Sequence, residues 1–96
     1  MKAGSLTPAG LADYLRIGEP DAAELKLLRG LREAALSYIM GRTGLGREQV
    51  DEKPELAYAA MVLVSHMYDS RSYQLGPDYS NKMVEAAIAM HRVNWA

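Results

Sequence analysis

Few residues in this chain have the types and spacing that chemistry requires, and His66 with Asp69 comes closest. The two lie three positions apart in a stretch that reads as a helix, so their side chains would share one face and could bind one metal ion. A structural metal site needs about four ligands. The chain contains no Cys, and no third ligand lies near this pair in the sequence. We therefore expect no metal or other cofactor.

Nucleophilic catalysis has equally little support. Ser65 and His66 are adjacent, so on a helix their side chains diverge and cannot act together as nucleophile and base. His91 falls within an apolar stripe, which favours a packed histidine over a catalytic one. The glycines of "GRTGLGRE" lack the preceding strand and the Lys-Ser/Thr pair of a phosphate-binding loop. The sequence predicts a protein that is not an enzyme.

Length and charge restrict the function further. A chain of 96 residues predicts one domain, over residues 1–96. Its 11 basic and 12 acidic residues give a net charge of −1, so no basic excess favours binding to phosphates. The start "MKAGSLTPAG" has no apolar run behind its Lys, and no stretch approaches the roughly 20 apolar residues of a membrane span. We expect a protein of the cytoplasm, or of a particle assembled there, without a membrane partner.

Helix signals dominate the chain, and they predict an all-α fold: a small bundle of about four helices joined by loops. One helix is short and N-terminal, two are long and central, and one is C-terminal. The first is capped by Thr7 and ended by Gly18 and Pro20, the second covers residues 21–43, the third runs from Pro54 to about Ser70, and the fourth runs from Ser80 or Asn81 through Val93. The segments "GLGREQVDEKPEL", from Gly44, and "SYQLGPDYS", residues 72–80, read as loops.

The third helix is apolar nearly all round. It begins with "LAYAAMVLV", Leu56 to Val64, and turns polar only after Tyr68. A helix without a polar face must be covered on all sides. We therefore expect it to form the core, covered by the other helices and by a second subunit.

The second helix carries two apolar sectors. The broader one predicts its buried face. Leu25, Leu36 and Met40 lie away from that face, among charged residues. They form either a patch that faces a partner or a surface packed against the first helix.

The order of motifs resembles the head–tail connector family of tailed bacteriophages, also called DNA-packaging or adaptor proteins. The resemblance covers roughly residues 6–92. It rests on "LADYLRI", on a Pro-Asp loop, on Tyr38-Ile39 followed by Thr43-Gly44, and on an apolar run that leads to His66, Tyr68 and Arg71, with a final helix after a loop. The sequence departs from the family at "AMHRVNWA", where Trp95 extends beyond the Arg that often closes such chains.

The resemblance implies a structural role in the virion. Such proteins are all-helical and form a ring under the portal protein, which they join to the tail while the genome passes through the centre. The implied partners are further copies of the chain, the portal protein, a tail-side connector or tail-completion protein, and DNA that slides past without sequence-specific binding. Isolated, the chain would be a monomer, a small oligomer or a ring. It would be found in the virion, or in the host cytoplasm during assembly.

The resemblance also suggests where partners bind. The polar segment after the apolar run would reach a partner, with Tyr68, Tyr73, Leu75 and Tyr79 as anchors and Arg71 as a bidentate hydrogen-bond donor. The other interpretation is that these side chains fold back over Trp95 and the fourth helix.

Two other functions remain open. The segment "LTPAGLADYLRI" is similar to the first helix of a small helix-turn-helix DNA-binding regulator. However, the helix that would enter the groove opens with Glu19, Asp21 and Glu24, which phosphates repel. A plain helical homodimer without a viral role is the third possibility.

Overall fold

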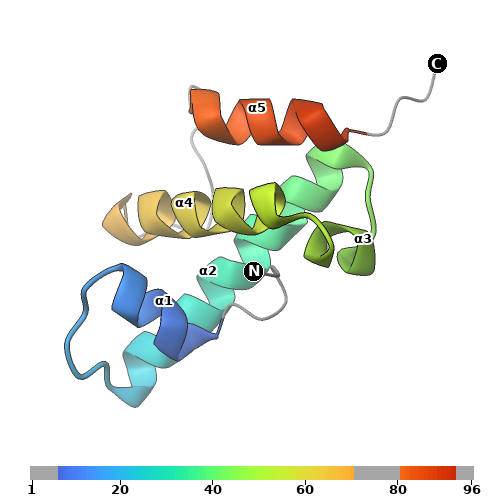
Figure 1. The fold of residues 1–96 in the computed structure, drawn as a ribbon. Helices are drawn as coiled ribbons and strands as arrows, with labels where there is room; N and C mark the ends of the chain where they lie inside the picture. Colours follow the sequence, from blue (N-terminus) through green and yellow to red (C-terminus); the bar gives the residue numbers. More distant parts are fainter. Residues whose placement is uncertain (1–6, 71–80, 93–96) are drawn as a thin grey trace.

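The computed structural model describes residues 7–70 and 81–92, and within these ranges all regular structure is helical (Figure 1). The elements are α1 (Pro8–Tyr14), α2 (Ala22–Thr43), α3 (Arg47–Asp51), α4 (Pro54–Ser70) and α5 (Lys82–His91). The predicted all-α bundle is confirmed. Its four predicted helices correspond to α1, α2, α4 and α5, and α3 is an addition.

The start of α1 follows the sequence signals, but its end does not. Thr7 caps the helix by accepting a hydrogen bond from the Gly10 N–H at 3.0 Å, and Pro8 occupies the first helical position. The helix stops at Tyr14, before Gly18. Arg16 adopts a left-handed conformation with φ of 59°, and the Ile17 N–H donates to the Ala12 carbonyl at 2.9 Å. A non-glycine residue thus provides the termination that glycine usually provides, at a cost of about 1–2 kcal/mol.

Helix α2 begins and ends where the sequence predicts. The Asp21 carboxylate accepts a hydrogen bond from the Glu24 N–H, and Gly44 ends the helix in the left-handed region with φ of 78°. Thr43 is buried beside this cap, where its hydroxyl donates to the Ile39 carbonyl at 2.7 Å and accepts from the Leu45 N–H at 3.2 Å. The "Thr-Gly" pair therefore ends the helix: Thr43 satisfies backbone groups, and Gly44 makes the turn.

The predicted loop after Gly44 is partly wrong, because it contains the short helix α3. The Gln49 side chain accepts a hydrogen bond from the Gly46 N–H at 2.9 Å, which satisfies a backbone donor at the start of this helix. Val50 is fully buried in the core. Helix α3 has only five residues, and one of them is a buried apolar residue, so it produces no periodic pattern in the sequence. The pattern of residues 44–53 therefore indicates only a loop.

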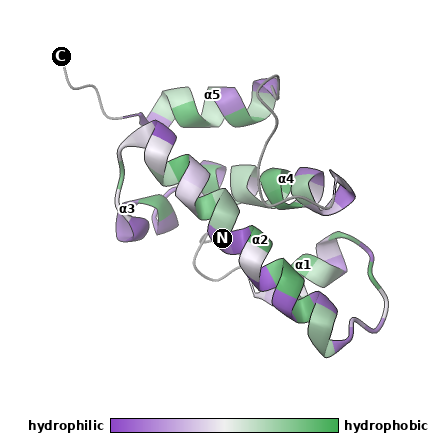
Figure 2. Cartoon of the chain, turned by 180° about the vertical axis from the view of Figure 1, so that it is seen from behind, coloured by the Kyte–Doolittle hydropathy of each residue, from purple (hydrophilic) through white to green (hydrophobic). Residues whose placement is uncertain are grey.

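Helix α4 is central to the core, as predicted. Seven of its residues are buried: Leu56, Ala57, Ala59, Ala60, Leu63, Val64 and Met67. It packs against α2, α3 and α5, and Figure 2 shows hydrophobic colouring along it with hydrophilic residues gathered toward its end. Among the described residues, none of the helices combines the length and apolar character that crossing a bilayer requires.

Helix α5 runs antiparallel to α4 at one end of the molecule, whereas α1 lies at the opposite end (Figure 1). Asn81 caps α5 by accepting hydrogen bonds from the Met83 and Val84 N–H groups, which confirms one of its two predicted starts. The helix ends at His91, since Arg92 is already extended, so the predicted end at Val93 is too late. Val84 and Ile88, on the inner face of α5, are buried in the core.

We expect Leu63→Ala to lower the free energy of unfolding by about 2–5 kcal/mol, because Leu63 is fully buried and its removal leaves a cavity in the core. Equilibrium unfolding in urea would measure this. Met90→Ala, at an exposed helical position, is the control, and it should change stability by less than about 0.5 kcal/mol. A similarly small effect at Leu63 would contradict the central position of α4.

Candidate partner-binding surfaces

The described part of the chain contains no group of three or more His, Cys, Asp or Glu side chains that could hold a metal ion. His66 and Asp69, the pair with ligand-like spacing, both lie exposed near the end of α4. His91 is half-buried and contacts Glu55.

The structure separates the three α2 residues that were expected to form one apolar patch. Leu36 is fully buried, so its place in a partner-facing patch is wrong. The reason is that α2 contacts α1, α3, α4 and α5, and these neighbours cover more of its circumference than one helical stripe. Met40 is partly buried against the same core. Leu25 is half-exposed and lies in a groove beside α1.

Tyr68 is occupied within its own chain. It is half-buried, and its hydroxyl donates to the Glu24 carboxylate across 3.3 Å, which joins the end of α4 to the start of α2. The other predicted anchors, Arg71, Tyr73, Leu75 and Tyr79, lie outside the described residues, as do the predicted loop 72–80 and Trp95.

An apolar groove between α4 and α5 was not predicted as a site. Its volume is about 290 Å³, and it is lined by Glu55, Tyr58, Ala59, Met83, Ala86, Ala87 and Met90. Three of these side chains are large, apolar and exposed: Tyr58 by 49%, Met83 by 43% and Met90 by 66%. Met83, Ala86 and Met90 recur at helical spacing on the outer face of α5, and this pattern could have indicated the surface. We call these residues the α4–α5 surface.

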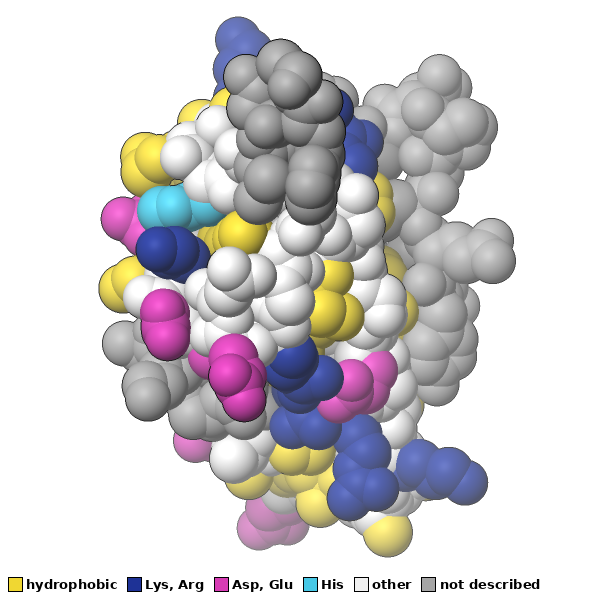
Figure 3. All heavy atoms as spheres, turned by 90° about the vertical axis from the view of Figure 1, so that its right-hand side faces the viewer, with side chains coloured by type: hydrophobic (Ala, Val, Ile, Leu, Met, Phe, Trp, Pro, Cys, Tyr) yellow, Lys and Arg dark blue, Asp and Glu magenta, His cyan; other side chains and the backbone are white. Residues whose placement is uncertain are grey.

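A second groove lies between α1 and α2 and has a volume of about 550 Å³. Its lining combines apolar residues with basic ones: Thr7, Pro8, Ala9, Ala22, Leu25, Lys26 and Arg29. Figure 3 shows Lys and Arg side chains gathered beside hydrophobic ones over the lower part of one face, the half of the molecule that contains α1 and the start of α2. We call this the α1–α2 groove.

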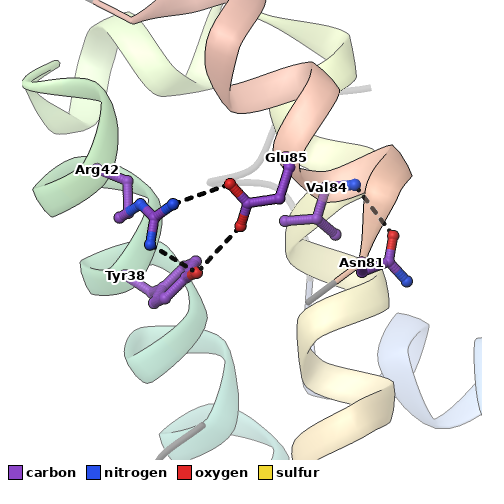
Figure 4. Close-up of polar contacts among 5 residues, drawn as sticks. All are labelled: Tyr38, Arg42, Asn81, Val84 and Glu85. Atoms are coloured by element: carbon purple, nitrogen blue, oxygen red, sulfur yellow. Dashed lines mark hydrogen bonds and ion pairs between the residues drawn. The ribbon is translucent and has the colours of Figure 1, made fainter. Parts of the chain in front are cut away.

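A polar contact fixes α5 on α2 (Figure 4). Arg42 forms an ion pair with Glu85 at 2.8 Å and donates to the Tyr38 hydroxyl at 3.3 Å, and that hydroxyl lies 3.5 Å from the second Glu85 oxygen. The Arg42 guanidinium also lies 5.4 Å from the centre of the Tyr38 ring. Partial burial is the main reason why the pKa of Tyr38 is raised above 10.0, so the hydroxyl stays protonated and can donate.

A second contact joins the other end of α5 to the start of α4. His91 Nε2 lies 3.2 Å from a Glu55 oxygen. Glu55 stands in the first turn of α4, the helix end that favours an acidic side chain. The pKa of Glu55 is lowered from 4.5, chiefly because its carboxylate accepts a hydrogen bond from its own backbone N–H and then because of the hydrogen bond with His91. Glu55 is thus an anion at neutral pH at the edge of the α4–α5 surface.

Comparison of the chain with family models, with curated protein sequences and with solved structures finds no match in any of the three.

We expect Glu55→Gln to change how the thermal midpoint depends on pH. Because the folded-state pKa of Glu55 is lowered, its contribution to stability is present above about pH 4.5 and is lost as the pH falls through the folded value. The variant should melt slightly earlier than wild type at pH 6, and the two curves should converge toward pH 3. Glu48→Gln, at an exposed position of α3, controls for the loss of one carboxylate. Parallel curves for wild type and Glu55→Gln would show that the lowered pKa of Glu55 does not contribute to stability.

Proposed function

We propose that this chain is a non-enzymatic assembly protein of a tailed bacteriophage or prophage: a head–tail connector that binds the portal and joins the capsid to the tail. The observation that carries the proposal is the α4–α5 surface, where Tyr58, Met83 and Met90 are exposed together on a small helical domain. Apolar side chains gathered at one exposed site are typical of protein–protein contact sites.

The motifs that suggest the family also have consistent places in this fold. Ile39, Thr43 and Gly44 form the end of α2, and Tyr38 fixes α5 through Arg42 and Glu85. The apolar run of the third predicted helix is the core helix α4. The motifs on which the resemblance rests therefore form the end of α2 and the core helix α4. This agreement supports the proposal.

DNA recognition has weaker support. The candidate recognition helix is α2, which has α1, α3, α4 and α5 packed around it and buries six of its residues. Its first turn contains Glu24, and Asp21 caps it. Its exposed face carries Glu33 as well as Lys26 and Arg29, so it offers phosphates no uniformly basic surface. We therefore favour binding to proteins.

The test is cosedimentation of the purified chain with assembled portal rings encoded by the same genome. We expect the chain to pellet with the rings at a fixed stoichiometry, and to remain in the supernatant without them. Portal rings of an unrelated phage are the control. Absence of binding at protein concentrations of several tens of micromolar would contradict the connector role.

Fluorescence anisotropy with a random DNA duplex at physiological salt provides a separate test. We expect no saturable binding below about 10 µM, because a chain with a net charge of −1 would displace few counterions from the DNA when it binds. Submicromolar affinity with a clear sequence preference would instead support the helix-turn-helix regulator.

A further inference from the structure

We infer that the α4–α5 surface of one copy docks into the α1–α2 groove of a second copy of this chain, head to tail. The inference rests on the proposed assembly function and names a partner for the surface that carries it. Its basis is that the two surfaces match in chemistry and differ in position.

The α4–α5 surface has the character of an inserted element. Met90 is 66% exposed and Tyr58 49%, and both side chains line a groove of only about 290 Å³. Methionine adapts its shape to an apolar pocket, and tyrosine combines an apolar ring with a polar tip. The charged residue that lines this surface is Glu55, an acid.

The α1–α2 groove has the character of a receiving site. It is larger, at about 550 Å³, and Pro8, Ala9 and Leu25 give it an apolar base. The charged residues that line it are Lys26 and Arg29, both basic. When the two surfaces meet, apolar side chains cover one another and Glu55 approaches two cations, so the contact is complementary in charge.

The position of the two surfaces determines what the contact can build. Helix α5 lies at one end of the molecule, and α1 with the start of α2 lies at the other (Figure 1). A copy that uses both surfaces therefore contacts two different neighbours. Such a heterologous contact covers both grooves and produces a closed ring or an open filament. A twofold contact between α4–α5 surfaces would leave the α1–α2 groove open.

Charge reversal tests the pairing. In sedimentation velocity from about 10 µM to about 1 mM, we expect wild type to associate in a concentration-dependent manner. Glu55→Lys and Lys26→Glu should each weaken association at least about tenfold, because each places like charges across the contact. An equimolar mixture of the two variants should recover association, since every contact in an alternating assembly then pairs opposite charges.

Glu48→Lys, a reversal at an exposed α3 residue outside both grooves, should leave association unchanged. The thermal midpoint of each variant at low concentration shows that it is folded. A wild type that remains monomeric at 1 mM would overturn the inference. Single variants that associate like wild type, or a mixture without recovery, would overturn it as well.

Cysteine pairing distinguishes head-to-tail from twofold contact, because the chain has no cysteine of its own. Under mild oxidation, a mixture of Met90→Cys and Leu25→Cys chains should form mainly the mixed disulfide dimer. Met90→Cys by itself should remain largely monomeric. Efficient Met90–Met90 pairing would show that the α4–α5 surface pairs with itself, and would overturn the inference.

These results are separable from the proposed function. Association with the predicted pairing, combined with absence of portal binding, would retain this contact and reject the connector role. Portal binding by a chain that never self-associates would retain the connector role and reject this contact.

Discussion

The fold depends on one constraint: α4 has no polar side until its last turns, so apolar neighbours must surround it. Seven of its residues are buried. Three other helices, α2, α3 and α5, pack on it and bury most of its apolar residues, while Tyr58 stays exposed. Burial of apolar surface is the dominant favourable term in folding, so the position of α4 determines where these helices lie. The polar contacts join the edges of helices that apolar burial holds together, as Arg42 and Glu85 do between α2 and α5.

That constraint also explains what remains on the surface. In a small domain the helices that cover α4 have few apolar residues to spare, and α5 covers it with one face only. Its other face keeps Met83 and Met90 exposed beside Tyr58. Helix α1 lies at the far end on α2, where it leaves a groove edged by Lys26 and Arg29. The surfaces that we propose for assembly are thus those that the core did not use.

Much of this fold could be predicted from the sequence, because helix ends are local. Thr7, Asp21 and Pro54 carry the start signals in their own side chains, Gly44 ends α2 because it has no Cβ, and α2 and α4 have the predicted bounds. What could not be predicted depends on distant contacts. Leu36 is buried because α2 has neighbours on several sides, and α3 exists because Val50 finds the core. The α4–α5 surface was not predicted either, because the exposure of Tyr58 and Met90 follows from how α5 is placed on α4.

Hydrogen exchange of backbone amides under native conditions tests the central role of α4 most directly. The account predicts that the amides of Leu63, Val64 and Met67 exchange only when the whole domain unfolds, so their opening free energies equal that from chemical denaturation. The amides of α1 and α5 should exchange through smaller openings. If the α4 amides exchanged at a lower opening free energy than those of α1 or α5, α4 would not be the element on which the fold depends.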